Sequence, residues 1–408
     1  MKKMVTDIML MPTYVSRFTC IGGDCEDTCC AGWGVTIDKD SFFRYQSCFD
    51  PVLRPLFTRH VKPYAKSKSS QDYGHIELRK DECRNCGLLS DKKLCLIQER
   101  LGEQALSDTC AYYPRTIFRF GDLHQMTLTL SCPEAARLAL LDEDAFGFVG
   151  EAQTASRDFI HAVKPKLGLS LDVMAEVQTL MFQILRSRDT PLANRLKIIG
   201  LFIGRLTGLL QAGSVTAVPD LLQELERDLG SGAALAPFLG TTELPDVQAQ
   251  IAATLFLVGD KSFQSPYVQK ILDEAAKGLG FRNGTAPDQA DLLEAYELGR
   301  NRLAPALEAV PWLLEHFMLN EILRTTFPWG LENPKQQYAA LVLRFATVRL
   351  LLVGRAAARE APLEPKELAE TVQVTCRRFV HDQNYTRNAN HFLADIGRDS
   401  LERLFALL

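Results

Sequence analysis

Apolar residues recur every three or four positions in long stretches after Pro133, the spacing that places them on one face of an α-helix. The clearest stretch covers residues 192–210, where leucines and isoleucines mark a single face. Proline, glycine and aspartate separate it from similar stretches on either side. We therefore predict further helices at residues 135–141, 171–187, 218–229, 245–257, 268–279, 287–298, 303–319, 336–353, 365–379 and 388–408.

The residues before Pro133 follow a different pattern, in which glycines and prolines interrupt short apolar pieces. Residues 38–45 predict a short helix, with Asp38 favoured as its N-cap, and residues 94–106 also have helical spacing. Alternating residues at 116–120 and 123–130 predict a hairpin across Gly121 and Asp122. We expect the rest of this third of the chain to consist of loops and short elements.

The change of pattern predicts two regions. A chain of 408 residues is too long for one ordinary core. We expect a mostly α fold, in which an irregular cysteine-rich metal-binding N-terminal region, residues 1–140, packs on a multi-helical C-terminal body, residues 141–408. A cluster of small residues marks a candidate division of the body near residues 230–242.

Composition and charge exclude several classes of protein. Charged residues make up 24% of the chain and the formal net charge is −4, with lysines and arginines spread among acids, so we expect no nucleic-acid partner. The most apolar stretch, residues 339–353, contains Arg344 and Arg349 and is shorter than the roughly 20 residues a membrane helix needs, so we predict a buried core helix and no membrane association. Asp7 breaks any apolar run at the N-terminus, and without a signal peptide the expected location is the cytoplasm.

The cysteines are the most unusual feature of the sequence. Ten of the eleven lie in the first 132 residues, and in a reducing compartment such clusters are more typical of metal ligands than of disulfides. Cys48 and Cys376 lie apart from the clusters and are expected to pack as apolar residues. The candidate metal ligands are Cys20, Cys25, Cys29, Cys30, Cys86, Cys95, Cys110 and Cys132.

Eight thiolates suffice for two four-cysteine sites, or for one cluster and one structural ion. Soft sulfur donors without a neighbouring histidine favour an iron-sulfur cluster or zinc over magnesium or calcium. A structural zinc that stabilises an irregular region is the simpler alternative.

Four stretches of sequence carry a resemblance to a known family. They are Cys20-Ile-Gly-x-x-Cys25-Glu-Asp-x-Cys29-Cys30 followed by Gly32-Trp33, Leu94-Cys95-x-Ile97-Gln98, Cys110-x-x-Tyr113-Pro114-Arg115, and Ser131-Cys132-Pro133-Glu134. Together they resemble the flagellin lysine-N-methylase family, part of a group with a CxxCxxCC-type iron- or zinc-chelating region. The match covers roughly residues 14–140. The family's usual Cys-Pro-Phe-Leu segment is here Cys86-Gly87-Leu88-Leu89.

The resemblance implies methyl transfer from S-adenosylmethionine to lysine ε-amines of flagellin in the bacterial cytoplasm. It also implies an iron-sulfur cluster, most simply a 4Fe-4S cluster, with zinc as the alternative metal. The sequence lacks the Cys-x3-Cys-x2-Cys pattern of radical enzymes and a glycine-rich turn between a strand and a helix. The methyl donor therefore needs an unconventional site, either at an open iron position or beside a purely structural cluster.

Four residues near the cysteines are candidates for that chemistry. Arg115 is expected to bind the donor's carboxylate, and Tyr113 to orient or deprotonate the lysine amine. The structural alternative for Arg115 is an ion pair with an acid such as Asp24, Glu26 or Asp27. Asp27 is also a candidate for attracting a cation, and Trp33 for stacking on a cation or shielding the cluster from water. The catalytic candidates are thus Tyr113 and Arg115, and the cofactor-binding candidates Asp27, Trp33 and Arg115.

A second class of function fits the same residues. A non-enzymatic metal-binding or redox-sensing module, whose helices recognise a partner protein, would need the same cysteines and the same helical body. Binding of S-adenosylmethionine that depends on the metal would distinguish the enzyme from this module.

Overall fold

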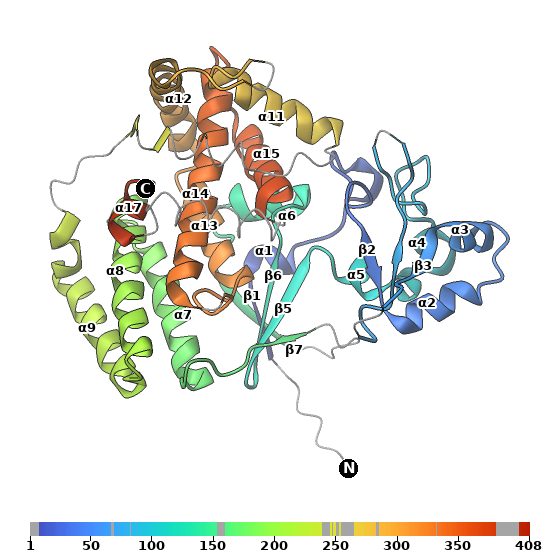
Figure 1. Cartoon of the computed structure of the whole chain (residues 1–408), viewed down its shortest axis with the longest axis horizontal. Coiled ribbons are helices and arrows are strands. Elements are labelled where there is room, and N and C mark those ends of the chain that lie inside the picture. Colours follow the sequence, from blue (N-terminus) through green and yellow to red (C-terminus); the bar gives the residue numbers. More distant parts are fainter. Residues whose placement is uncertain are drawn as a thin grey trace.

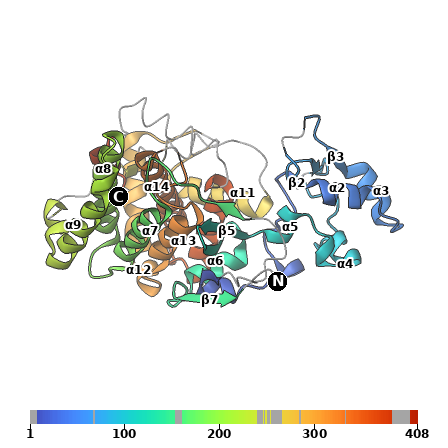
Figure 2. The ribbon, with the colours of Figure 1, turned by 90° about the horizontal axis from the view of Figure 1, so that it is seen from below.

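The structure is a computed structural model that describes residues 8–66, 69–81, 83–152, 160–238, 245–246, 248–249, 253, 265–282, 285–331, 333–380 and 400–408. Most of these residues are helical, which confirms the predicted fold class. Helices fill the left and centre of Figure 1, and a smaller lobe stands at the right. Figure 2 shows the same lobe at one end of the molecule. We name residues 20–34 the cysteine loop, residues 35–112 the cysteine lobe, and the described helices after residue 133 the helical body.

A five-stranded sheet lies between the lobe and the helical body, with strand order β7-β1-β6-β5-β8. The predicted hairpin is confirmed as its centre, because β5 and β6 pair antiparallel across the turn at Gly121 and Asp122. The other strands join residues far apart in sequence, since β1 pairs parallel with β6 and antiparallel with β7. The strands are β1 (Ile8–Pro12), β5 (Arg115–Phe120), β6 (Leu123–Leu128), β7 (Phe148–Ala152) and β8 (His161–Ala162).

The cysteine lobe has a small sheet and short helices. Its strands β2 (Val35–Ile37), β4 (Gly74–Ile76) and β3 (Val61–Pro63) pair antiparallel, in that order. Asp38 is the N-cap of α2 and accepts a hydrogen bond from the Ser41 N–H at 2.7 Å, as predicted. The predicted helix at residues 94–106 is interrupted by Gly102, whose φ is +82°. The helical elements are α2 (Lys39–Gln46), α3 (Leu53–His60), α4 (Leu96–Leu101), η2 (Glu103–Ala105) and α5 (Asp108–Tyr112).

The helical body confirms most predicted helices. Short segments precede it, α1 (Thr13–Ser16) and η1 (Gly22–Asp24). Its own elements are α6 (Pro133–Leu140), α7 (Leu171–Arg186), α8 (Leu192–Gln211), η3 (Val215–Ala217), α9 (Val218–Ser231), η4 (Ala233–Phe238), α11 (Pro266–Gly278), α12 (Gln289–Ala309), α13 (Leu313–Arg324), α14 (Pro334–Ala357), α15 (Pro365–Thr375), the π-helical turn η5 (Cys376–Val380) and α17 (Leu401–Phe405).

One predicted boundary is wrong. We expected a break between residues 298 and 303, but α12 continues through this stretch and includes Pro305, and the chain turns instead at residues 310–312, around Pro311. A proline inside a helix removes one backbone hydrogen bond, and packing against a neighbouring element can keep the helix continuous. A break at residues 298–303 in addition to the one at residues 310–312 would leave only a short helical fragment between them. The predicted helix at residues 388–408 is described only as α17, and most of the predicted helix at residues 245–257 lies outside the described residues.

Three hydrophobic cores organise these elements, and the smallest packs α11 against Leu351 of α14 and Val374 of α15. The largest joins the five-stranded sheet to the helical body, and α14 contributes a nearly continuous run of buried side chains to it, as predicted for residues 339–353. A separate core lies within the cysteine lobe, between residues 35 and 106. No described helix combines the length and the apolarity needed to cross a bilayer. The division at residue 140, and a further one near residues 230–242, stay predictions.

Candidate metal centre

The cysteine loop folds back against the lobe through backbone hydrogen bonds. Gly22 adopts a φ of +59°, which L-residues rarely adopt, and so allows the tight turn between the first two cysteines. Ala31 forms an isolated β-bridge with Asn85. The Cys86 N–H donates to the Cys30 carbonyl oxygen at 2.6 Å. These bonds bring Cys30 and Cys86 together although 55 residues separate them along the chain.

Three further candidate cysteines lie in the first turn of short helices. Cys95 is the N-cap of α4, Cys132 is the N-cap of α6, and Cys110 lies in α5. Backbone N–H groups at a helix start favour the thiolate. The N–H groups of Ala135 and Glu134 accordingly act to lower the pKa of the Cys132 thiol, although its burial acts more strongly in the opposite direction.

The candidate thiols form two neighbouring groups. The first contains Cys30, Cys86, Cys95 and Cys110. Each of these thiols either raises the pKa of another member by its charge or has its own pKa raised by one. Cys25 and Cys132 are linked in the same way and form the second. Cys29 lies between the groups and is close enough to influence the pKa of every thiol in both. Cys20 is exposed at the start of the loop.

Burial keeps most of these thiols neutral. It raises the pKa of Cys25 and Cys86 to about 11, and that of Cys110 and Cys132 to about 12. Cys29 is the exception, because a hydrogen bond from Cys30 and, to a smaller extent, the Arg377 charge outweigh its burial and lower its pKa to about 7. A buried group of thiols without histidine, each able to give up its proton to a cation, fits the donor set of an iron-sulfur cluster. Within the described part of the chain, no three His, Cys, Asp or Glu side chains are arranged to hold a metal ion.

Trp33 and Tyr113 lie together beside the cysteine loop. The Trp33 indole N–H donates to the Cys29 carbonyl oxygen at 2.6 Å, and its ring lies 5.9 Å from that of Tyr113. The Tyr113 hydroxyl pairs with the Ser131 hydroxyl at 3.0 Å. Burial, followed by the charges on Cys132 and Cys29, raises the pKa of Tyr113 well above its usual range. Tyr113 is therefore a neutral phenol, whose hydroxyl can both donate and accept a hydrogen bond.

Arg115 and Asp27 have different surroundings. Arg115 begins β5, and its guanidinium lies over the Phe18 ring at 5.3 Å. Among the described residues, it forms no ion pair with Asp24, Glu26 or Asp27, because Arg137 pairs with Glu26 and Arg377 with Asp27. Asp27 is buried and its carboxylate is already fully engaged by residues of the helical body. A direct contact between Asp27 and a bound cation would break these bonds.

No sequence motif indicated the residues that hold Asp27. Arg377 lies 350 residues away along the chain, Gln373 lies one turn earlier, and Ser265 precedes α11. None belongs to a cysteine motif, and an arginine followed by another arginine, Arg378, resembles an ordinary helix end. Their role depends on how α15 packs, which no local pattern records.

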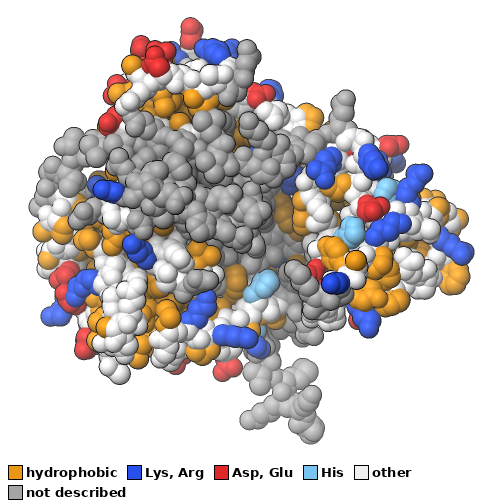
Figure 3. Space-filling view, in the orientation of Figure 1, with side chains coloured by type: hydrophobic (Ala, Val, Ile, Leu, Met, Phe, Trp, Pro, Cys, Tyr) orange, Lys and Arg blue, Asp and Glu red, His pale blue; other side chains and the backbone are white. Residues whose placement is uncertain are grey.

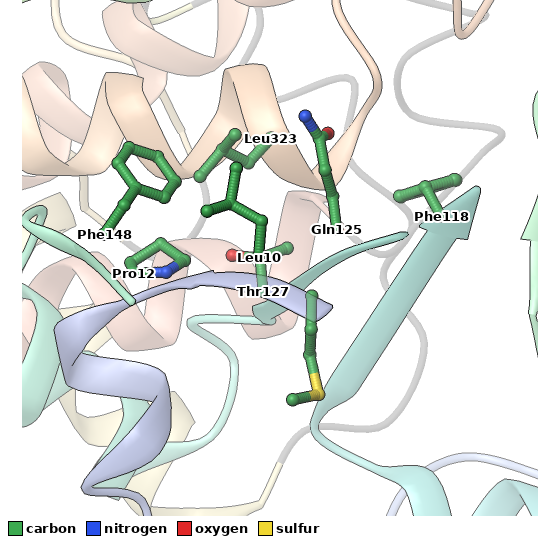
Figure 4. A pocket seen from close by; sticks show the side chains of 8 residues that line it. Leu10, Pro12, Phe118, Gln125, Thr127, Phe148 and Leu323 are labelled. Atoms are coloured by element: carbon green, nitrogen blue, oxygen red, sulfur yellow. The ribbon is translucent and has the colours of Figure 1, made fainter. Parts of the chain in front are cut away.

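A hollow lies beside the five-stranded sheet, and none of the candidate thiols lines it. Its lining comes from β1, β5, β6 and β7 together with Leu323 of α13, and Figure 4 shows Phe148, Pro12 and Leu10 on one side and Gln125 on the other. Its volume is about 10 Å³, far below the roughly 300–1,000 Å³ of typical ligand pockets. It contains no charged side chain that would hold an amino-acid group.

Comparison with known proteins decides the family. The profile described as the FliB lysine N-methylase C-terminal domain matches residues 178–407, which is more than half of the chain. The chain belongs to the FliB lysine N-methylase family. This confirms the resemblance identified from the N-terminal motifs, although those motifs lie outside the matched range.

Curated relatives of this FliB-family chain agree. A lysine-N-methylase of Salmonella typhimurium is 35% identical over 134 residues, and one of Salmonella choleraesuis is 34% identical over the same length. Each match spans 33% of this chain and only 33% of the relative. The flagellar biosynthetic protein FliU of Salmonella muenchen is 34% identical over 149 residues, which cover 36% of this chain and 86% of FliU. No solved structure matches the chain.

Proposed function

We propose that this protein transfers methyl groups from S-adenosylmethionine to lysine ε-amines of flagellin in the bacterial cytoplasm, and that the cysteines hold a 4Fe-4S cluster. Family membership over residues 178–407 is the observation that carries this proposal. The name of the relative FliU supports a flagellar protein as the substrate.

The proposed reaction is a displacement at carbon. The lone pair of a neutral lysine amine forms a bond to the sulfonium methyl carbon, the carbon–sulfur bond breaks, S-adenosylhomocysteine leaves, and the amine later releases one proton. The site must therefore hold the lysine without its proton and align it with the methyl group. A water-poor site lowers the pKa of a lysine amine and achieves the first requirement.

Arg115 and Tyr113 are the residues we propose for positioning. The Arg115 guanidinium has no carboxylate partner among the described residues and lies over an apolar ring, a setting that favours a carboxylate ligand such as that of the methyl donor. Tyr113 is neutral at physiological pH because burial raises its pKa, so we propose that it orients the amine by a hydrogen bond and leaves the proton to the solvent. Trp33 lies beside Tyr113 and the Cys29 backbone, and we propose that it shields them from water.

We propose Cys30, Cys86, Cys95 and Cys110 as the ligands of the cluster. They come from four separate segments of the chain, and each is partly or fully buried. In a cubane cluster each thiolate binds a different iron, so the sulfurs are spread more widely than around one ion. Cys25, Cys29 and Cys132, with Cys20 nearby in sequence, remain candidates for a second site.

The surface of the cysteine lobe suits a protein partner. Phe43, Phe49, Val52 and Leu101 are large apolar side chains exposed on it, and Phe49 is 86% exposed. On the face drawn in Figure 3, lysine and arginine side chains surround apolar ones at the right, over the lobe. Clustered exposed apolar groups are typical of protein contacts.

Purification under anaerobic conditions tests the proposal. We expect about four irons with matching sulfide per chain, and binding of S-adenosylmethionine by the same sample. Incubation with flagellin should then add methyl groups to its lysines, measured by mass spectrometry, while a Tyr113→Phe, Arg115→Met variant should not. Zinc without sulfide and no donor binding would contradict the proposal and favour the non-enzymatic module.

A further inference from the structure

Arg377 spans the part of the cysteine loop that contains Cys29 and Cys30. Its Nε lies 2.8 Å from Oδ2 of Asp27, and its Nη2 donates to the carbonyl oxygens of Thr28 at 3.1 Å and Ala31 at 2.8 Å. These contacts bracket the two adjacent cysteines from both sides. One guanidinium therefore fixes the backbone on which both thiols are carried.

Gln373, another partner of Asp27, connects the cysteine loop to the residue before Cys132. We call Arg377 and Gln373 the clamp residues. Gln373 donates through Nε2 to Oδ2 of Asp27 at 3.0 Å and to the carbonyl oxygen of Ser131, the residue before Cys132, at 2.9 Å. The Ser265 hydroxyl donates to Oδ1 of Asp27 at 3.0 Å. The helical body thus holds the cysteine loop and the start of α6 through a single buried carboxylate.

A buried ion pair holds a loop in place only at a high cost in desolvation free energy. Desolvating both charges costs several kcal/mol, and apolar packing of the same volume often stabilises a protein as well or better. Neutral donors such as asparagine could satisfy the carbonyl oxygens of Thr28 and Ala31. The Arg377 guanidinium also lies against the backbone on both sides of Cys29 and Cys30, so its charge is close to any centre that these thiols hold. A positive charge beside the loop has an electrostatic effect on this centre that a neutral hydrogen-bond donor would lack.

We propose that Arg377 is a positioning residue of the metal centre, which fixes Cys29 and Cys30 against the helical body and sets the reduction potential of the centre by its charge. Asp27 opposes this charge and holds the guanidinium in place. The inference rests on the proposed iron-sulfur cluster, and it assigns roles to residues that no cysteine motif contains.

The two charges make opposite predictions. A cluster that takes up one electron from a chemical reductant gains one negative charge, which a nearby positive charge stabilises and a negative charge destabilises. Arg377→Met should therefore make the midpoint potential more negative, and Asp27→Asn should make it more positive. Loosening of the loop alone would let water reach the cluster in both variants and would shift both potentials in the same direction.

The test uses the full chain, purified anaerobically, with iron and sulfide analysis and a potentiometric titration followed by absorbance. Arg377→Lys keeps the positive charge but loses the planar guanidinium that donates several hydrogen bonds at once. We therefore expect the purified variant to contain less iron, while the midpoint potential of its cluster stays unchanged. Arg195→Met is the matched control, because Arg195 is a buried arginine of α8 that pairs with Glu315 at 2.7 Å. It should leave both iron content and potential unchanged.

Shifts of opposite sign for Arg377→Met and Asp27→Asn would support the inference. Equal potentials, or shifts of the same sign, would overturn it while the cluster itself stands. If Arg377→Met is isolated without iron, the comparison of Arg377→Lys with Asp27→Asn decides, because only the second should raise the potential. A wild-type chain without iron and sulfide would instead overturn the proposed cluster.

Discussion

The imidazole ring of His60 lies directly over the α-carbon of Gly87, the residue that follows Cys86. A side chain at position 87 would overlap the ring, so His60 and the glycine require each other. The family resemblance places proline at this position, and the His60 ring explains why this chain departs from that pattern. The contact lies next to a candidate metal ligand.

Gly87→Ala should lower the free energy of unfolding by about 1–3 kcal/mol, because the new methyl group would displace the His60 ring. Urea unfolding measures the change. His60→Ala removes the obstacle, so the double variant should lose less than the sum of the two single variants. Strictly additive losses would show that the two residues do not interact.

Cys110→Ser should reduce the iron content of the anaerobically purified protein and its thermal stability together, because we propose that the metal centre organises the lobe. Cys48→Ser is the matched control. It is the same substitution in the same lobe, at a cysteine that packs at the edge of the lobe's core. Elemental analysis of both variants measures the difference, and full iron content in Cys110→Ser would remove this cysteine from the ligand set.

Arg115→Met should weaken the binding of S-adenosylmethionine by roughly tenfold to a hundredfold, the usual loss for one hydrogen bond to a charged group. Arg119→Met is the control, because Arg119 is exposed on the same strand, β5. Isothermal titration of the loaded protein gives both dissociation constants. Equal affinities in the two variants would exclude Arg115 from the donor site.

Asp38→Ala should cost about 1 kcal/mol of stability, because it removes the N-cap of α2. The same carboxylate accepts a hydrogen bond at 3.4 Å from the N–H of Asp108, at the start of α5, which carries Cys110. Loss of the cap should therefore also loosen α5, which hydrogen exchange can detect. Asp40→Ala, an exposed residue of the same helix turn, should change neither property.

His316 should make the fold sensitive to acid between about pH 6.5 and pH 4. Burial lowers its pKa to about 4, and its Nδ1 lies 2.9 Å from the Ala139 carbonyl oxygen. Below pH 6.5 the unfolded chain binds a proton that the folded chain still excludes, so stability is fully present above that pH and falls as the pH approaches 4.

The expected loss at this histidine is roughly 3 kcal/mol. In His316→Asn, where the amide N–H can replace Nδ1–H, the difference in stability between pH 7 and pH 4.5 should shrink by about that amount. His161→Asn, at an exposed histidine, should keep the full difference. Chemical unfolding at the two pH values measures both variants, and an unchanged difference in His316→Asn would assign the acid sensitivity to other groups.

The helices could be predicted because their signal is local. The apolar spacing in residues 192–210 reproduces α8 closely, and the N-cap at Asp38 depends on residues three positions apart. The five-stranded sheet was largely missed, because β1 is short, does not alternate, and finds its partners more than 110 residues later. Pairing of that kind is fixed by packing and leaves no periodic trace in the sequence.

The metal centre stays a prediction from the cysteines, and the arrangement of the thiols was not predictable. The positions of the cysteines indicated a metal centre, but the sequence clusters do not correspond to the groups in space. Cys30 groups with Cys86 and Cys110, whereas Cys25, from the same sequence cluster as Cys30, groups with the distant Cys132. A bond between Asp27 and Arg377 spans 350 residues, and no pattern within one segment could reveal it.

The order in which the chain is synthesised gives this separation a consequence. All eight candidate cysteines leave the ribosome by residue 132, whereas the clamp residues Gln373 and Arg377 follow roughly 240 residues later. At about 5–20 residues per second, that interval is on the order of tens of seconds. During this time Asp27 lacks its partners Gln373 and Arg377, so the proposed metal centre has an interval for assembly before these residues fix the cysteine loop.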